Sequence, residues 1–409
     1  MNTKNNMLYL SLFLVPALLL VTNNYSVGVI VITLLLSFIG LKKDGITKLN
    51  TFDYVIVSVF VSYFLGAIPV AISDGSTLRY FQGGGRLLLC LPIYIFFRQN
   101  IALDKEKALN MMRYGAFIGS IGTFIFAIYQ HFFLEMPRVG GYLFSINFGY
   151  LACSLTIICF GLAHKSNLKV ALYLAAVAAF IATLLTLTRG AILAAPLLLI
   201  FSAIIDRKQI SFKKIVLFLV GLILSSAAAM NLSSGIKNRV NFTLYEVSQI
   251  VQGDISKAYS AGVRIELWDA AAHAFSEAPM TGLPYYQREN LNQKLFEKGV
   301  VSKWVTTVGR GHAHSQYFEM IASNGVWGLL SITFIFIVPL VIFIKHFLKT
   351  GSTFGYSGSL FVAGFMIFGI TEAPLQANLI GSFYGFMLAV FLAFIRHEKY
   401  PVSTNSDNP

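Results

Sequence analysis

Two histidines stand at the end of the longest polar interval of the chain. His312 and His314 lie in Arg310-Gly-His-Ala-His-Ser-Gln-Tyr-Phe318, directly before an apolar segment. An imidazole takes up or releases a proton near neutral pH, so the pair is a candidate for general acid–base chemistry. The histidines are two residues apart and would project about 200° apart on a helix, so we expect them to have separate roles.

Arginines flank tight turns elsewhere in the chain. Arg189 lies in Leu187-Thr-Arg-Gly190 between two apolar segments, and Arg86 follows a run of three glycines. A guanidinium binds phosphate through a planar pair of N–H groups, and the N-terminus of a helix after Arg189 would add its own attraction. Glycines allow a ligand to approach the backbone closely. A lipid-headgroup contact for Arg189 and a flexible turn at residues 83–85 stay open as alternatives.

Other chemistries have weaker support. The histidines lack an H-E-x-x-H motif, a cysteine partner and a carboxylate at ligand spacing, so we expect no metal. No G-x-S-x-G pattern surrounds Ser315, and no P-loop motif is present, so neither a serine hydrolase nor a nucleotide cofactor is expected. Cys90, Cys153 and Cys159 all fall in apolar segments, which gives no support to a disulfide framework.

The composition indicates a membrane protein. Of the 409 residues, 56% are hydrophobic and only 12% are charged, which is more apolar surface than a soluble core of this size buries. The formal net charge of +13 is spread over short basic runs between apolar segments, as in membrane topology signals, so no nucleic-acid partner is expected.

About twelve segments are candidates for crossing the bilayer, which requires roughly 17 to 25 apolar residues per helix. They are residues 7–21, 27–41, 54–72, 87–97, 114–133, 143–163, 170–187, 191–205, 215–230, 317–344, 360–370 and 379–395. The fold class expected is therefore an all-α polytopic membrane protein. We divide it into nine spans (1–230), an outer segment (231–316), three spans (317–400) and a disordered tail (401–409).

The basic residues predict the orientation. One alternate set of connections and ends holds eighteen Lys or Arg, whereas the short connections of the other set hold only four arginines: Arg79, Arg86, Arg138 and Arg189. The excess marks the cytoplasmic side. Both termini are therefore expected in the cytoplasm, and residues 231–316 on the opposite face.

The outer segment is expected to contain short amphipathic helices. Residues 264–275 place Leu267, Trp268, Ala271, Ala272 and Phe275 on one stripe, and a second helix is expected over residues 288–298. The first helix would lie on the membrane or on the bundle. The segment has nine Lys or Arg against seven Asp or Glu, so an anion site would depend on a few well-placed arginines.

The motifs around these residues resemble those of the bacterial O-antigen ligase family. His314-Ser315, nine residues and then Gly325 resemble its H-[N/S/Q]-x9-G signature after a long external loop. Thr188-Arg189-Gly190 resembles its Ser/Thr-Arg-Gly turn.

A third segment, in the outer loop, completes the resemblance. Gly262-Val-Arg264, with Trp268 and Pro279 to Gly282 downstream, resembles the family's Gly-Arg…Trp…Pro…Gly pattern. Gly282-Leu-Pro284 departs from it where a second glycine is usual. The motifs cover residues 186–327, and the twelve-span layout extends the resemblance over the chain.

The resemblance implies transfer of a glycan from undecaprenyl pyrophosphate to a sugar hydroxyl of the lipid A core. The reaction would take place at the periplasmic face of a bacterial inner membrane, without metal or cofactor. It implies a fold like that of multi-span membrane glycosyltransferases, with a lateral opening for the lipid. The partners expected are this donor, this acceptor and membrane lipids; the oligomeric state stays open.

The resemblance also implies roles for individual residues. His314 would be the general base, with a pKa lowered by nearby arginines, and His312→Ala would be tolerated. Arg189 and Arg264 would hold the pyrophosphate, and attack from the opposite side would invert the anomeric centre. Further substrate-binding candidates are Arg79, Arg86, Arg310, His312 and Gln316.

Three alternatives remain open. An O-antigen polymerase or a protein O-oligosaccharyltransferase would use the same donor. A lipid-linked glycan flippase or another transporter would also be a basic, twelve-span protein, although charged residues within the spans are scarce here. A purely structural scaffold would leave the three motifs unexplained.

Overall fold

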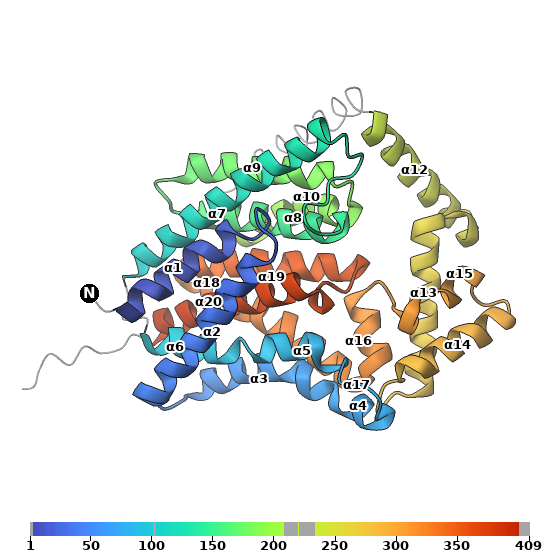
Figure 1. The fold of residues 1–409 in the computed structure, drawn as a ribbon, viewed down its shortest axis with the longest axis horizontal. Coiled ribbons are helices and arrows are strands. Elements are labelled where there is room, and N and C mark those ends of the chain that lie inside the picture. The colour runs from blue at the N-terminus through green and yellow to red at the C-terminus, as the bar shows by residue number, and fades with distance from the viewer. Residues whose placement is uncertain (1–2, 101–103, 208–219, 221–233, 401–409) are drawn as a thin grey trace, which may run out of the picture.

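The fold is a bundle of helices with a smaller group of helices at one end (Figure 1). The computed structural model describes residues 3–100, 104–207, 220 and 234–400. All regular elements in these ranges are helices, which confirms the all-α class. In the same ranges, seven helical stretches are long and apolar enough to cross a membrane, and three shorter apolar helices accompany them.

The first half of the chain supplies ten helices among the described residues. They are α1 (Thr3–Ala17), α2 (Tyr25–Asp44), α3 (Thr51–Gly66), α4 (Ile68–Asp74), α5 (Phe81–Leu88), α6 (Leu91–Asn100), α7 (Lys105–Ile128), α8 (Ser145–Leu162), α9 (Lys169–Leu185) and α10 (Arg189–Ile205). A π-helical turn, η1 (Tyr129–Phe133), extends α7. The expected span 87–97 is divided between the short helices α5 and α6. The expected span 215–230 and the tail 401–409 lie outside the described residues.

The remaining helices form the outer segment and the last part of the bundle. The outer segment has α12 (Ser234–Val251), η2 (Ile255–Lys257), α13 (Tyr259–Glu277), α14 (Tyr285–Glu297), α15 (Lys303–Thr306) and η3 (Gly309–Gly311). After it come α16 (Gln316–Asn324), α17 (Val326–Ile332), η4 (Thr333–Ile337), α18 (Val338–Thr350), α19 (Thr353–Thr371), η5 (Pro374–Gln376) and α20 (Asn378–Lys399). Helix α19 is longer than the expected span 360–370.

The last two long helices form the centre of the bundle. In the apolar window of α19, 83% of residues are buried, and in that of α20 the share is 94%, against 28% for α2 at the periphery. Both central helices contain several phenylalanines and glycines. Small residues let helix backbones come close where lipid removes the usual hydrophobic drive for association. The turn between α19 and α20 is consequently held in a fixed position.

The two ends of the bundle differ in what they contain. The N-terminus and the end of α20 lie at one end, and α12 to α15 lie at the other (Figure 1). At the end that holds the termini, the buried carboxylate of Asp53 accepts a hydrogen bond from Tyr94 at 2.7 Å and pairs with Arg98 at 3.1 Å. Asp53 also caps the start of α3. This ion cluster ties helices together at the end opposite the outer segment.

The two predicted helices of the outer segment are present, but the buried face of the first one differs from the predicted face. Helix α13 contains the expected 264–275 and begins five residues earlier, and α14 matches the second expectation, with Leu291 and Leu295 buried. On α13, Leu267 and Ala271 are buried as expected, but Ala272 is exposed. The face is turned because α13 packs on α16, where the Trp268 ring stacks on Phe318 at 5.3 Å.

The expected span 317–344 is wrong at its beginning, because the helix breaks at Gly325. Gly325 has φ 59°, and a Cβ there would lie 2.3 Å from the carbonyl oxygen of Pro279. The amide of Val326 donates to that same oxygen at 2.8 Å. At Gly282, with φ 76°, a Cβ would lie 2.0 Å from the Ser323 carbonyl oxygen. The two glycines therefore allow the chain after α13 to cross the end of α16.

Candidate active site

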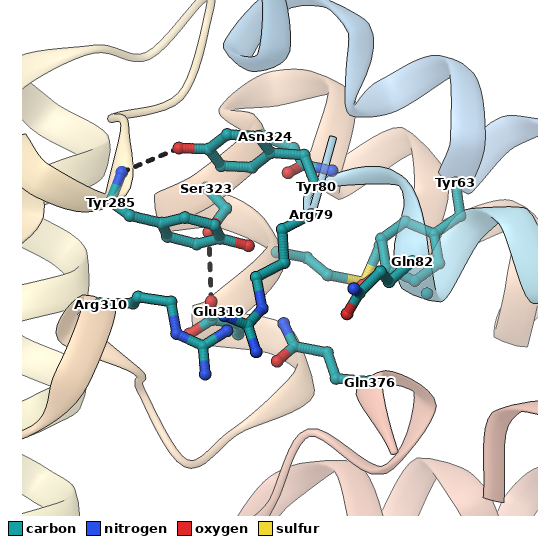
Figure 2. Close-up of a pocket in the computed structure, with 12 residues that line it drawn as sticks. Tyr63, Arg79, Tyr80, Gln82, Tyr285, Arg310, Glu319, Ser323, Asn324 and Gln376 are labelled. Carbon is teal, nitrogen blue, oxygen red and sulfur yellow. Dashed lines mark hydrogen bonds between the residues drawn. The ribbon is translucent and has the colours of Figure 1, made fainter. Parts of the chain in front are cut away.

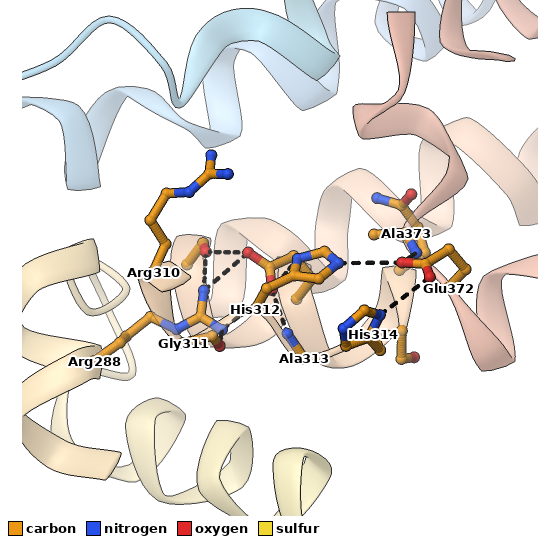
Figure 3. Close-up of polar contacts among 12 residues, drawn as sticks. Arg288, Arg310, Gly311, His312, Ala313, His314, Glu372 and Ala373 are labelled. Atoms are coloured by element: carbon orange, nitrogen blue, oxygen red, sulfur yellow. Dashed lines mark hydrogen bonds and ion pairs between the residues drawn. The ribbon is translucent and has the colours of Figure 1, made fainter. Parts of the chain in front are cut away.

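The two histidines share one carboxylate. Glu372, in the turn after α19, accepts from Nε2 of His312 and from Nδ1 of His314, each at 3.1 Å (Figure 3). The ring centroids are 4.7 Å apart. The expectation that the histidines project apart is wrong, because they lie in a loop, where His314 has φ 45°, and not on a helix.

A second carboxylate contacts His312 alone. Glu319 on α16 lies 3.4 Å from its Nδ1. Burial opposes protonation of His312, but the charges of Glu319 and Glu372 prevail and raise its pKa to about 9. Burial would raise the pKa of each carboxyl, whereas the cations beside them lower both below the usual range. His312 is therefore an imidazolium at neutral pH.

His314 is bound in a different way. A deprotonated carboxylate only accepts hydrogen bonds, so the Nδ1 that contacts Glu372 carries the hydrogen when the ring is neutral. Nε2 then has the free lone pair. The side chain is 31% exposed, so this nitrogen is within reach of a substrate. The amide of Ala373 donates to Glu372 at 3.0 Å and fixes the orientation of the carboxylate.

A buried ion pair holds the histidine loop against α16. Arg288 of α14 binds both oxygens of Glu319, at 2.9 and 3.1 Å, and the two side chains are only 2% and 3% exposed (Figure 3). Arg288 also donates to Ser323 at 2.7 Å and to the carbonyl of Gly311. The amide of Ala313 donates to Glu319 at 2.9 Å. The backbone before His312, at Gly311, and the backbone after it, at Ala313, are thus both held by the Arg288–Glu319 salt bridge.

Two predicted arginines meet at one hydroxyl. Arg189 donates through Nη2 to Oγ of Ser260 at 3.1 Å, and Arg264 donates through Nη1 to the same atom at 3.0 Å. Arg264 also donates through Nε to the carbonyl of Thr371 at 3.3 Å, one residue before Glu372. The arginine pair and the histidine cluster are consequently neighbours, although the sequence separates them widely.

The glycine after Arg189 has a packing reason. A Cβ at Gly190 would lie 2.3 Å from Oγ1 of Thr371, which is hydrogen-bonded to the Tyr150 hydroxyl at 2.9 Å. Any larger residue would displace the start of α10 from the turn that carries Glu372. The Thr-Arg-Gly turn therefore brings Arg189, as the first residue of α10, next to the histidine cluster.

Further charges surround the arginine pair. The fully buried carboxylate of Glu246 on α12 pairs with Nη1 of Arg189 and accepts from the amide of Ala261 at 3.0 Å. Burial, and next the charge of Arg189, lower the pKa of both Arg138 and Arg239. The guanidinium groups of four arginines therefore lie close enough to affect one another: Arg138, Arg189, Arg239 and Arg264. Helix α12 supplies one carboxylate, Glu246, to this group. Such an excess of positive charge is suited to a multiply charged anion.

Two of the other predicted ligand residues have structural partners. Arg86 donates to Asn378 at 3.1 Å and to the Gln376 carbonyl at 3.0 Å, so it holds the start of α20. Gln316 is fully buried, and its side-chain oxygen accepts from the Leu375 amide at 3.0 Å. Both side chains fasten the turn that carries Glu372.

The flexible turn that was left open for the glycine run is wrong, because the run is helical. Residues 83–85 lie within α5, and a Cβ at Gly84 would lie 2.5 Å from the backbone nitrogen of Phe64 on α3. A Cβ at Gly83 would lie 2.8 Å from the Tyr63 ring. Gly83 and Gly84 thus allow close packing of α5 on α3, and Gly83 also lines the polar pocket described next, whereas a Cβ at Gly85 would meet nothing within 4 Å.

The remaining candidates, Arg79 and Arg310, lie together at a polar pocket beside the histidine loop. The pocket has a volume of about 160 Å³ and lies between α5, α14 and α16 (Figure 2). Glu319 lines it as well, so this pocket and the histidine cluster share a wall.

The acidic residues of the site are not predicted by any motif in the sequence. Glu372, Glu319 and Glu246 each come from a different segment, and no local spacing connects them to the histidines. Glu372 carried a signal nonetheless, because an acidic residue in the short turn Thr371-Glu-Ala-Pro374 between two apolar segments is uncommon without a function.

Residues that are not at metal-ligand spacing in the sequence come together in the fold. His312, His314 and Glu372 present ligand atoms that all lie within 4.8 Å of one another. Hydrogen bonds between the histidines and the carboxylate engage the same atoms. A metal at this position would have to displace these two hydrogen bonds.

Helices and site together define a polytopic membrane protein with an acid–base cluster beside an arginine-rich anion site. The family model described as O-antigen ligase matches residues 174–333, and this match supports assignment of the chain to the O-antigen ligase family. The matched range includes Arg189, Arg264 and His314, but not Glu372. An uncharacterised protein of Haemophilus influenzae is 25% identical over 349 residues, which cover 83% of this chain and 84% of that protein.

Proposed function

We propose that the protein is a glycosyltransferase of the O-antigen ligase type. It transfers a glycan from undecaprenyl pyrophosphate to a sugar hydroxyl of the lipid A core, in lipopolysaccharide biosynthesis. The family match supports an O-antigen ligase or polymerase type of function. The observation that carries the finer proposal is the His314–Glu372 pair next to two arginines that meet at Ser260.

His314 acts as the general base in this proposal. The acceptor hydroxyl gives its proton to Nε2, while Nδ1–H stays bonded to Glu372, which stabilises the imidazolium that forms. His312 is a poor base at neutral pH, because it is already protonated. Its positive charge instead keeps Glu372 deprotonated and ready to support His314.

The arginines act on the donor. As the acceptor oxygen bonds to the anomeric carbon, the bond from that carbon to the pyrophosphate oxygen breaks and the electron pair leaves with the pyrophosphate. Arg189 and Arg264 neutralise this charge from a position where both already donate to Ser260. Attack opposite the leaving group inverts the anomeric centre. Guanidinium groups take the part that a divalent cation often has, so the proposed reaction is metal-independent.

The site faces the periplasm in this proposal, and both termini face the cytoplasm. The outer helices and the termini lie at opposite ends of the bundle, which supports the orientation predicted from the lysines and arginines (Figure 1). Both lipid-linked substrates would then meet at the outer surface of the inner membrane.

A reaction with purified protein tests the proposal. The full chain in detergent receives lipid-linked glycan and lipid A core, with EDTA and without nucleotide. A glycan–lipid A conjugate is expected. Elongation of the donor alone would indicate a polymerase, and glycosylation of an added protein would indicate an oligosaccharyltransferase. Absence of any product, together with glycan translocation in liposomes, would indicate a flippase and overturn the proposal.

A further inference from the structure

The polar pocket at Arg79 and Arg310 is built from six separate parts of the chain, which include α3 with Tyr63 and η5 with Gln376. The residues before α5 supply Arg79, the start of α14 supplies Tyr285, η3 supplies Arg310, and α16 supplies Glu319 (Figure 2). The side-chain amides of Gln82, Asn324 and Gln376 also line it. Hydroxyl and amide groups around one small cavity provide donors and acceptors for a polyhydroxylated ligand.

Aromatic stacking keeps the wall of this pocket in place. The rings of Tyr80 and Tyr285 stack with centroids 4.2 Å apart, and the Tyr80 hydroxyl donates to Asp74 at 2.8 Å and accepts from the Tyr285 amide at 2.9 Å. The guanidinium of Arg310 lies 5.8 Å from the Tyr285 ring centre. The pocket is thus organised before any ligand enters, which reduces the entropy lost on binding.

The positive charge of the pocket is uncompensated. Within the described ranges, the guanidinium groups of Arg79 and Arg310 make no hydrogen bond or ion pair, and both point into the same space (Figure 2). Glu319, the one carboxylate among the lining residues, is neutralised by Arg288 at 2.9 Å. Burial raises the pKa of the Tyr285 phenol to about 12, so its hydroxyl stays a donor. Two guanidinium forks and a phenol therefore face one cavity.

An unpartnered amide also belongs to the wall. Asn324 is 4% exposed, and its Nδ2 has no hydrogen-bond partner. A buried donor without a partner is costly, so such a group in a pocket wall indicates a ligand that accepts from it.

The pocket and the donor arginines are connected to the histidine cluster through different residues. Glu319 connects it to His312, whereas Arg264 connects to Glu372 through the Thr371 carbonyl. The cluster that contains the proposed base is therefore in contact with both cationic regions. The Arg189–Arg264 pair suits the pyrophosphate, which leaves the pocket of Arg79 and Arg310 for the second substrate.

We propose that this pocket binds the acceptor, and that the acceptor is a saccharide carrying a phosphate group held by Arg79 and Arg310. The amides bind sugar hydroxyls and present the hydroxyl that is to be glycosylated toward His314. This inference rests on the proposed function and deepens it, because it assigns the chemical class of the acceptor and separates its site from that of the pyrophosphate.

Binding measured without donor tests the pocket independently of transfer. The probes are a phosphorylated core oligosaccharide released from lipopolysaccharide and the same oligosaccharide after phosphatase treatment, titrated calorimetrically into the full-length protein. The phosphorylated probe should bind at least tenfold more tightly. Arg79→Gln and Arg310→Gln should each remove about tenfold, because each removes a charge-assisted contact. Lys294→Gln, which removes an exposed charge on α14, should change nothing.

Kinetics separate this role from a structural one. In the transfer assay, the Arg79→Gln/Arg310→Gln double variant should raise the KM for the phosphorylated acceptor about 100-fold and leave kcat and the KM for the donor nearly unchanged. Lysine at both positions should restore part of the affinity. Equal losses with both oligosaccharides, or a raised KM for the donor, would overturn the assignment. Selective binding by a protein that performs no transfer would reject the proposed function and retain the phosphosaccharide pocket.

Discussion

Glu372 distinguishes the two histidines that contact it. It accepts from one nitrogen of each ring, but only His312 has a second carboxylate, Glu319, on its other nitrogen. His312 is therefore held as a cation between two anions, whereas His314 has a nitrogen free for a substrate. Residues two positions apart thus acquire different chemistry from their surroundings.

Removal of the proposed base should abolish transfer. We expect His314→Ala to reduce kcat by about 100-fold to 10,000-fold, the range found for loss of a general base. The assay is conjugate formation by purified protein at saturating substrates. His273→Ala is the matched control, because this exposed histidine on α13 bonds only within its own helix. Equal rates for the two variants would reject His314 as the base.

The sequence predicted that His312→Ala would be tolerated. The structure changes this prediction to a partial loss of transfer activity, because Glu372 would lose one of its two imidazole partners.

The contribution of Arg189 and Arg264 to transfer should depend on the shape of the guanidinium group as well as on its charge. Arg189→Lys keeps the charge but cannot bind Glu246 and Ser260 together, so transfer should fall at least tenfold. Arg264→Ala should have a larger effect, because it removes the charge. Both proteins should remain in the membrane at wild-type abundance, measured by immunoblot. Undiminished transfer by both variants would return these arginines to a headgroup-anchoring role.

The titration of His312 predicts how stability changes with pH. Its pKa is raised from the ordinary 6.5 to about 9 in the folded protein. The stabilisation is therefore complete below about pH 6.5 and is lost as pH rises toward 9. The thermal unfolding midpoint of the wild type should fall over this interval, and that of His312→Gln should fall less. Parallel curves for the two proteins would contradict the ion pairs drawn around His312.

At the scale of elements, one ion pair joins α14, the histidine loop and α16. Arg288→Met removes the partner of Glu319 and leaves a buried carboxylate uncompensated, which typically costs about 3–5 kcal/mol. We expect a lower unfolding midpoint and reduced membrane abundance. The Arg288→Met/Glu319→Gln double variant should recover part of that loss, because it removes the stranded charge. A double variant less stable than Arg288→Met would show that lost packing dominates.

The elements that could be predicted are those with a local cause. Long apolar segments predicted α2, α7 and α8, and four-residue spacing predicted α14. The break between α16 and α17 was missed, because the apolar pattern continues through it and only the contact of Gly325 with Pro279 requires it. The site shows the same difference between local and long-range causes. Local motifs identified Arg189, Arg264 and His314 as candidate site residues. Glu372 and Ser260 depend on long-range packing, which no spacing in the chain records.

At the scale of the whole molecule, the ends of the bundle are chemically distinct. One end holds the termini and the buried ion cluster of Asp53, and the other holds the histidine cluster, the polar pocket of Arg79 and Arg310, and the outer helices. Such polarity suits an enzyme whose two substrates are both anchored in one leaflet. It also makes the orientation in the membrane a direct test of the assignment.

Cysteine labelling checks this orientation. Cys90, Cys153 and Cys159 are buried, so the background reaction should be low. A cysteine at the exposed Gln293 of α14 should react in intact cells with a thiol reagent that does not cross the inner membrane, whereas one at the exposed Lys43 of α2 should react only after permeabilisation. Residue 209, also expected on the inner side, lies outside the described ranges. The opposite labelling pattern would place the histidine cluster in the cytoplasm and reject the ligase proposal.

The length of α16 has a consequence for how this site can vary. Nine residues make about two and a half turns, so the histidine end and the Gly325 end of this helix point to opposite sides. One end is fastened to the Glu372 turn and the other to the segment after α13. An inserted residue would rotate one attachment against the other by about 100°. The number of residues in α16 is therefore constrained by its two attachments, in addition to the side chains that the helix carries.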